Sequence, residues 1–221
     1  MKNFIICLSK IPASLETATN LKTQLEEFGA EAELFEGTYG NDAVEIMAAE
    51  QRTVHPQGIK GTIDVSGPWA EKISNPGIKG CFLSHYRLWQ KCVELNEPIA
   101  IWEDDVVLSI KFFSVDWEDV LVVALGHPNK SPKYMHLLES PEGEPRVLTY
   151  RNSSMPGCCG YAIKPHAAEK LIETYKKTFL PADNAINSSV VRIQIHNHIM
   201  GIAIVEGKKS LTSSKAWRNK K

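Results

Sequence analysis

The sequence predicts a single α/β domain that spans residues 1–221. Short apolar runs of strand type alternate with segments whose apolar residues recur every three or four positions, which is the pattern of strands that alternate with helices. The chain has 221 residues, 43% of them hydrophobic and 23% charged, so it is long enough for one large core. No internal repeat, low-complexity segment or linker divides it.

The first third is expected to form a strand, a helix and a second strand. Residues 4–8 are an apolar run, and Ser14 is expected to cap a helix that ends at Gly29. Partial alternation over residues 30–37 predicts the second strand. Residues 50–80 are rich in glycine and proline and show little periodicity, so we expect a long mobile loop over the functional site.

The rest of the chain continues this alternation. From Cys81 onward the apolar residues lie on one face of a helix, and residues 98–102 are typical of a buried strand. Pro165 is expected to open another helix, and Asp183 the last one. The apolar face of that last helix is expected to contain Ile186, Val190 and Ile193. Further strands are expected at residues 134–138, 159–163 and 202–205.

Charge and cysteine content exclude several classes of protein. The 25 basic and 26 acidic residues give a net charge of −1, which argues against a nucleic-acid binder. There is no apolar run of the length that spans a bilayer, and the opening apolar stretch is too short for a signal peptide, so we expect a cytoplasmic protein. The five cysteines lack C-x-x-C spacing and predict neither a disulfide framework nor a structural zinc site. The basic residues within 215–221 would allow peripheral contact with an anionic membrane.

Three consecutive carboxylates directly follow the strand at residues 98–102. Strand alternation would place Glu103 and Asp105 on one side and Asp104 on the other, so the first and third could bind a divalent cation together. Ligands of open α/β sheets bind at the C-terminal ends of the strands, which is where these acids lie. On spacing alone, a solvated acidic turn explains the same residues equally well.

Other residues are candidates for ligand contacts. His85 lies on the apolar face of its helix, where it is either a core histidine with locally satisfied ring nitrogens or part of the wall of a donor or metal site. His196 or His198 could complete a metal site opposite the acids, with a surface histidine pair as the alternative. Gly157 and Gly160 suggest a close approach of the backbone to a ligand.

The stretch from Asn75 to Leu108 contains the motif G-C-x-x-S-H-x-x-x-W on the expected helix, then an apolar strand and the letters E-D-D-V. The motif positions are Gly80, Cys81, Ser84, His85, Trp89 and residues 103–106. This order resembles the central signature of glycosyltransferase family 25. The segments FIICLSK, GCCGYAIKPHAAEKLI and LPADNAI are similar to further segments of that family, so the resemblance covers most of the chain in the right order.

This resemblance implies a GT-A-like (Rossmann-like) fold with a mixed central sheet flanked by helices. It also implies a UDP-sugar donor, a divalent metal (Mn²⁺ or Mg²⁺), and transfer with inversion to a saccharide or other hydroxyl acceptor. Galactose is the expected sugar, and lipopolysaccharide biosynthesis is one expected setting. A non-catalytic nucleotide-sugar-binding module of the same fold is the alternative. A nucleotidyl or phosphoryl transferase is disfavoured, because the sequence has no Walker-type loop and no G-x-G-x-x-G motif.

Roles for the candidate residues follow from such a reaction. The expected metal ligands are Glu103 and Asp105, whose hard oxygen donors suit Mn²⁺ and Mg²⁺, together with His198. Inversion requires a base on the face opposite the leaving group. Asp183 in LPADNAI is the first candidate and Glu139 the alternative, while simple capping of the next helix would also explain Asp183. The residues expected to line the donor site are Asp104, Ser84, His85, Gly157 and Gly160.

Overall fold

A mixed β-sheet forms the centre of the computed structural model, which describes residues 1–56, 73–108, 116–125, 147–150, 158–198 and 202–204. Within these ranges the sheet has seven strands in the order β2-β1-β4-β8-β6-β10-β7. Their bounds are β2 Ala32–Glu36, β1 Lys2–Cys7, β4 Ile99–Trp102, β8 Cys158–Ile163, β6 Val120–Leu125, β10 Ile195–His198 and β7 Val147–Tyr150.

Strand direction decides where a site can form. Strands β2, β1 and β4 are parallel neighbours, so their C-terminal ends lie at one edge of the sheet. Strand β8 runs antiparallel between β4 and β6, β10 is parallel to β6, and β7 is antiparallel to β10. Two small sheets are added, one pairing β5 (Val106–Leu108) with β11 (Ile202–Ile204) and one pairing β3 (Thr53–Val54) with β9 (Thr178–Phe179).

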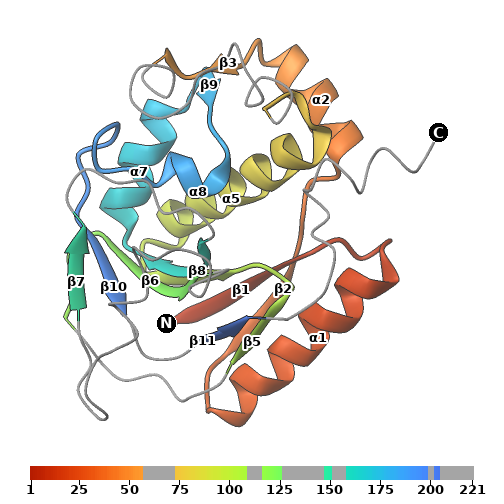
Figure 1. Cartoon of the computed structure of the whole chain (residues 1–221), viewed down its shortest axis with the longest axis vertical. Coiled ribbons are helices and arrows are strands. Elements are labelled where there is room, and N and C mark those ends of the chain that lie inside the picture. The colour runs from red at the N-terminus through yellow and green to blue at the C-terminus, as the bar shows by residue number, and fades with distance from the viewer. Residues whose placement is uncertain (57–72, 109–115, 126–146, 151–157, 199–201, 205–221) are drawn as a thin grey trace.

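Helices cover both faces of the sheet, as Figure 1 shows. The helices α2 (Gly40–Ala49), α5 (Pro76–Leu95), α7 (Pro165–Thr174) and α8 (Ala182–Ala185) lie on one face, and α1 (Pro12–Glu27) lies on the other. Alternation along each strand divides the core accordingly: Ile101 and Tyr161 face the larger group of helices, whereas Ile5 and Trp102 face α1. The mixed sheet flanked by helices confirms the predicted fold class.

Helix α5 begins at Pro76, five residues before the start expected at Cys81. Proline suits the first position of a helix, and the Asn75 side chain caps it by accepting a hydrogen bond from the Gly77 N–H at 2.8 Å. The helix ends at Asn96, which adopts a left-handed conformation (φ 50°). The last residues of the expected 50–80 loop are therefore helical. Helix α2, which precedes that loop, was not predicted at all.

Two expected helix starts are corrected. Helix α1 begins at Pro12, and Ser14 is buried inside its first turn, where its Oγ accepts a hydrogen bond from the Leu8 N–H at 2.9 Å instead of capping the helix. The helix expected from Asp183 is a single turn that ends at Ala185. The three apolar residues expected on its inner face are buried or half-buried, but they extend into the irregular segment before β10.

Several predicted features fall outside the described residues. These are the strand at 134–138, Glu139, Gly157, residues 57–72 of the expected loop and the basic residues of 215–221. The end of α1 at Gly29, which has φ +79°, and the final strand β11 agree with the predictions. Among the helices of the described ranges, none is both long and apolar enough to cross a membrane.

Candidate active site

The acids that follow β4 lie at the edge where the parallel strands end. Strand β4 ends at Trp102, although the Glu103 N–H still donates to the Cys159 carbonyl of β8 at 2.8 Å. Asp104 and Asp105 then form a turn before β5 begins in another sheet. Strand alternation therefore does not extend over Asp104 and Asp105, and it no longer supports the expectation that Asp104 points away from its neighbours. All three acids are half-buried, because the turn is enclosed between β4 and β5.

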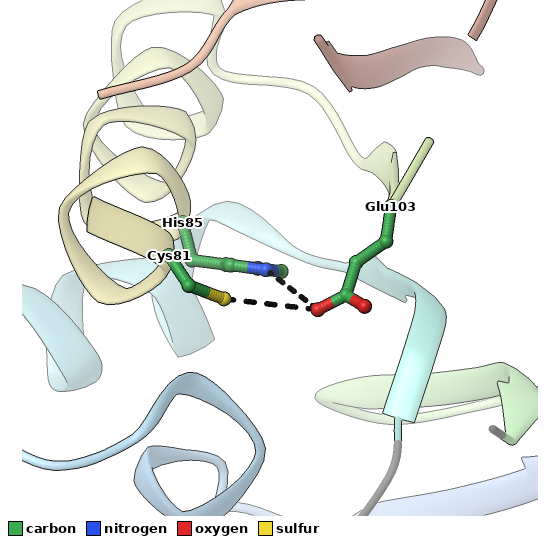
Figure 2. Close-up of side chains that lie close together, drawn as sticks. All are labelled: Cys81, His85 and Glu103. Atoms are coloured by element: carbon green, nitrogen blue, oxygen red, sulfur yellow. Dashed lines mark hydrogen bonds and ion pairs between the residues drawn. The ribbon is translucent and has the colours of Figure 1, made fainter. Parts of the chain in front are cut away.

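Glu103 faces two side chains of α5, as Figure 2 shows. Its Oε1 lies 3.7 Å from Sγ of Cys81 and 3.8 Å from Nε2 of His85. Cys81 and His85 are four residues apart, so they project from the same face of the helix. The three ligand atoms lie within 4.8 Å of one another. We call Cys81, His85 and Glu103 the Cys-His-Glu cluster.

His85 is held from behind by Tyr161 of β8. The Tyr161 hydroxyl lies 2.9 Å from Nδ1 of His85, and it accepts a hydrogen bond from Nε1 of Trp89 at 2.8 Å. The rings of His85 and Tyr161 stack with an interplanar angle of 14°. Only 2% of His85 is exposed, yet its Nε2 has no hydrogen-bond partner among the described residues. A core histidine would have both ring nitrogens hydrogen-bonded. In His85 this holds for Nδ1 but not for Nε2.

Negative charge surrounds the cluster. The pKa of the Cys81 thiol is raised well above its usual value, first by burial and then by the nearby carboxylates of Glu103, Asp183 and Asp104. Asp183 belongs to α8, which packs against α5 (Figure 1). The structure therefore brings Asp183 and Asp104 into the neighbourhood of Cys81. Helix α8 has Pro181 at its N-cap, so Asp183 lies in the first turn and does not cap the helix.

Ser84 joins α5 to the loop after β2. Its Oγ accepts a hydrogen bond from the Thr38 N–H at 2.8 Å and donates one to the Gly80 carbonyl at 2.7 Å, and only 1% of the residue is exposed. Gly80 permits this contact, because a Cβ added there would lie 2.4 Å from the Thr38 carbonyl oxygen. The Ser84 hydroxyl is therefore enclosed, and both of these hydrogen bonds are made within the protein.

The remaining candidates lie at different distances from the acids. Gly160 pairs with Trp102 across β4 and β8, so it is adjacent to the start of the acidic turn. His198 ends β10, which is three strands away from β4. Three strand spacings amount to about 14 Å between β10 and β4.

Cys81 and Tyr161 lie in segments that resemble the family, but sequence reasoning gave neither of them a role in the site. The absence of C-x-x-C spacing excluded a zinc site, but Cys81 and His85 have the i, i+4 spacing with which two residues of a helix can bind one ion. That spacing was a usable signal. The contact between Tyr161 and His85 had no such signal in the sequence, because it depends on the packing of α5 against β8.

The sheet edge, the acids after β4 and the helix motif together place the chain among α/β proteins whose ligands bind at the C-terminal ends of strands. The sequence profile of glycosyltransferase family 25 (LPS biosynthesis protein) matches residues 1–186. The chain belongs to this family.

Its relatives include bacterial and animal proteins. The chain is 31% identical over 127 residues to the lipooligosaccharide biosynthesis protein lex-1 of Haemophilus influenzae, covering 52% of this chain and 41% of that protein. It is 32% identical over 167 residues to procollagen galactosyltransferase 1-A of Xenopus laevis, covering 69% and 25%. It is also 29% identical over 111 residues to the lacto-N-neotetraose biosynthesis glycosyltransferase LgtB of Neisseria gonorrhoeae, covering 44% and 39%. The chain thus matches less than half the length of each of these relatives.

Proposed function

We propose that the chain is a metal-dependent inverting glycosyltransferase that moves galactose from UDP-galactose to a hydroxyl group of a saccharide or glycoconjugate. The observation that carries this proposal is the group of three acids after β4, at the edge where β1, β2 and β4 end. Asp183 of α8 lies close enough to this edge to help raise the pKa of Cys81. Galactose is favoured because a relative that matches 69% of the chain is named a procollagen galactosyltransferase.

The acids after β4 suit the expected ion. Carboxylate oxygens are the ligands that Mn²⁺ and Mg²⁺ prefer, and Glu103 and Asp105 would supply them. When bound, the ion would neutralise the negative charge that grows on the leaving diphosphate. We do not retain His198 as a third ligand, because β10 lies three strands away. Asp104 of this turn and Gly160, which pairs with Trp102 just before it, are the residues we propose for donor contacts.

Asp183 is the proposed base. Its carboxylate would accept the proton of the acceptor hydroxyl while that oxygen bonds to the anomeric carbon on the face opposite UDP. The bond between the anomeric carbon and the diphosphate oxygen breaks in the same step, and UDP leaves with the electron pair. One carboxylate is sufficient for this single displacement. Glu139, outside the described residues, is the alternative base.

His85 is better suited to positioning than to contact with the sugar. Its ring is almost completely buried, and the nitrogen that is not bound to Tyr161 faces Glu103. It would therefore act on the donor site by holding that carboxylate in place. Removing the imidazole is expected to affect metal binding more than recognition of the sugar.

A panel of nucleotide sugars tests the proposal. Thermal shift and calorimetry on the full chain should show UDP-galactose binding with Mn²⁺ and much weaker binding with EDTA, followed by slow release of UDP when no acceptor is present. Equal affinity with and without Mn²⁺ would remove the metal-dependent mechanism. Tight binding without any release of UDP, with or without an acceptor mixture, would instead support the non-catalytic nucleotide-sugar-binding module.

A further inference from the structure

The Cys-His-Glu cluster combines three kinds of ligand atom on two elements. Sγ of Cys81 and Nε2 of His85 come from α5, and the carboxylate of Glu103 comes from the residue after β4, as Figure 2 shows. A thiol, an imidazole and a carboxylate rarely converge for packing alone, since each of them is costly to bury without a partner.

The separations suit a tetrahedral ion. Zinc bonds of about 2.0 Å to nitrogen or oxygen and about 2.3 Å to sulfur place tetrahedral ligands about 3.3–3.7 Å apart. The measured separations from Glu103 Oε1 are 3.7 Å to sulfur and 3.8 Å to nitrogen, and all three ligand atoms lie within 4.8 Å of one another. Small rotations of the Cys81 and Glu103 side chains would bring all three ligands to bonding distance.

The unpartnered nitrogen of His85 is an independent indication of a ligand. A histidine that is 98% buried normally satisfies both ring nitrogens, because leaving one of them desolvated and unpaired destabilises the fold. Here Nδ1 contacts the Tyr161 hydroxyl, while Nε2 faces Glu103 without a hydrogen bond. A metal-binding histidine is arranged in the same way, with one nitrogen on the ion and the other held by a second residue that orients the ring.

We propose that Cys81, His85 and Glu103 form a binding site for a borderline divalent ion such as Zn²⁺, with a fourth position left for water. Thiolate and imidazole ligands favour Zn²⁺ over Mn²⁺ and Mg²⁺, so this site differs in ion class from the one expected for the sugar donor. Asp104 and Asp183 add negative charge nearby. The Cys81 proton passes to water as the sulfur–metal bond forms.

Occupation of this site would fix Glu103 to α5. Glu103 is also one of the carboxylates that we propose as ligands of the Mn²⁺ ion that binds with the sugar donor. Zn²⁺ at the Cys-His-Glu cluster would therefore compete with Mn²⁺ for this residue. The site itself does not depend on the transfer reaction. It is therefore tested with metal alone, without nucleotide or acceptor, and its failure would leave the proposed transferase activity untouched.

Cobalt provides the direct test. Co²⁺ is titrated into the reduced, untagged full chain, and the absorption spectrum is recorded. The expected result is a thiolate-to-cobalt charge-transfer band that Zn²⁺ abolishes by displacement. Cys81→Ser should lose the band and weaken Zn²⁺ binding by about a hundredfold or more, since even changes to a supporting residue cost about 10- to 100-fold. Glu103→Gln should keep the band but bind more weakly.

Cys92→Ser is the matched control. Cys92 lies on the same helix and is buried, but its sulfur contacts the carbonyls of Glu97 and Ile163 and not a carboxylate. This variant should retain the cobalt band and the Zn²⁺ affinity of the wild type. The proposal is overturned if the wild type binds no Co²⁺, if it binds Co²⁺ without the band, or if the band survives in Cys81→Ser.

A measurement on the wild-type chain covers the case in which Cys81→Ser does not fold. Iodoacetamide labelling is followed by peptide mass spectrometry, with EDTA and then with Zn²⁺. Cys81 is half-buried whereas Cys7, Cys92 and Cys159 are buried, so labelling of this thiol is distinguishable. Zn²⁺ should slow the labelling of Cys81 at least about tenfold, because a metal-bound sulfur is a poor nucleophile. Unchanged labelling of Cys81 would overturn the proposal.

Discussion

The hydroxyl of Tyr161 lies 2.9 Å from Nδ1 of His85, and this contact turns the other ring nitrogen of His85 toward Glu103. Tyr161 also accepts the indole N–H of Trp89, which lies one turn further along α5. A single phenol therefore links β8 to two motif residues of the helix. The orientation of His85 is set by the sheet as well as by its own helix.

Replacing Tyr161 by Phe tests this link. The loss of the hydroxyl leaves buried groups of His85 and Trp89 unpaired, so the free energy of unfolding should fall by about 1–3 kcal/mol. Zn²⁺ affinity should fall about 10- to 100-fold, because the imidazole is no longer held. Urea unfolding and metal titration measure the two effects.

Tyr175→Phe is the control for that variant. Its hydroxyl donates to the Ala185 carbonyl at 3.0 Å and does not touch His85. It should lower stability by a similar amount while Zn²⁺ binding stays unchanged. Equal loss of metal affinity in both variants would mean that general loosening of the core, and not the Tyr161 contact, governs the cluster.

The reactivity of Cys81 should depend on pH in a defined direction. Its pKa is raised, first by burial and then by nearby carboxylates, so at pH 8 less of it is thiolate than in an ordinary cysteine. With EDTA present, alkylation of Cys81 in the folded chain should be slower at pH 8 than in urea, and it should accelerate as the pH rises through 9 and 10. Cys92, whose pKa burial raises to about 11, should react still more slowly because it is not exposed. Faster labelling of folded than of unfolded Cys81 at pH 8 would contradict this electrostatic description.

Gly80 should tolerate no side chain. A Cβ there would lie 2.4 Å from the Thr38 carbonyl oxygen, which is backbone and cannot rotate away. Gly80→Ala should therefore destabilise the fold by about 1–3 kcal/mol in urea unfolding, despite the better helix propensity of alanine. Gln90→Ala, at an exposed position of the same helix, should change stability little. Wild-type stability of Gly80→Ala would show that the loop after β2 moves easily.

The sequence predicted the parts of the fold whose signal is local. Strands β1, β4 and β8 are apolar runs, and α7 carries a clear helical period after Pro165, so both kinds of element could be identified from spacing. Helix α5 was found from its apolar face, but its start was placed too late. Pro76 and Gly77 there look like loop residues, and only the Asn75 cap shows that they begin a helix.

The candidate site was predictable only where a motif carried it. Glu103 and His85 belong to a recognisable sequence pattern, and the structure places them 3.8 Å apart. The direction of Asp104 was not predictable, because the chain turns at Asp104 and Asp105 and strand alternation no longer applies there. The role of Tyr161 depends on a contact across 76 residues of sequence, which no spacing rule reveals.

Asp105→Ala should weaken UDP binding in Mn²⁺ while leaving the fold intact. The residue lies in a half-buried turn next to Glu103 and Asp104, so removing one carboxylate takes away a metal ligand and relieves repulsion between like charges. Calorimetry should show a loss of at least about tenfold in Mn²⁺-dependent affinity for UDP. Asp116→Ala, at an exposed position, should behave as the wild type. Unchanged Mn²⁺ dependence in Asp105→Ala would remove this residue from the metal site.

Asp183→Asn tests the proposed base. The amide keeps the size of the side chain but cannot accept the proton, so transfer should slow by about a hundredfold or more. Stability should change little, because Asp183 is half-buried in a single turn of helix that Pro181 begins without a side-chain cap. UDP affinity in Mn²⁺ should persist, since the base acts on the acceptor side.

Asp42→Asn is the control for this variant and should transfer sugar normally, because Asp42 is an exposed acid in the first turn of α2. If Asp183→Asn remains active while Glu139→Gln is inactive, the base is Glu139. Loss of UDP affinity in Asp183→Asn would instead assign Asp183 to the donor site.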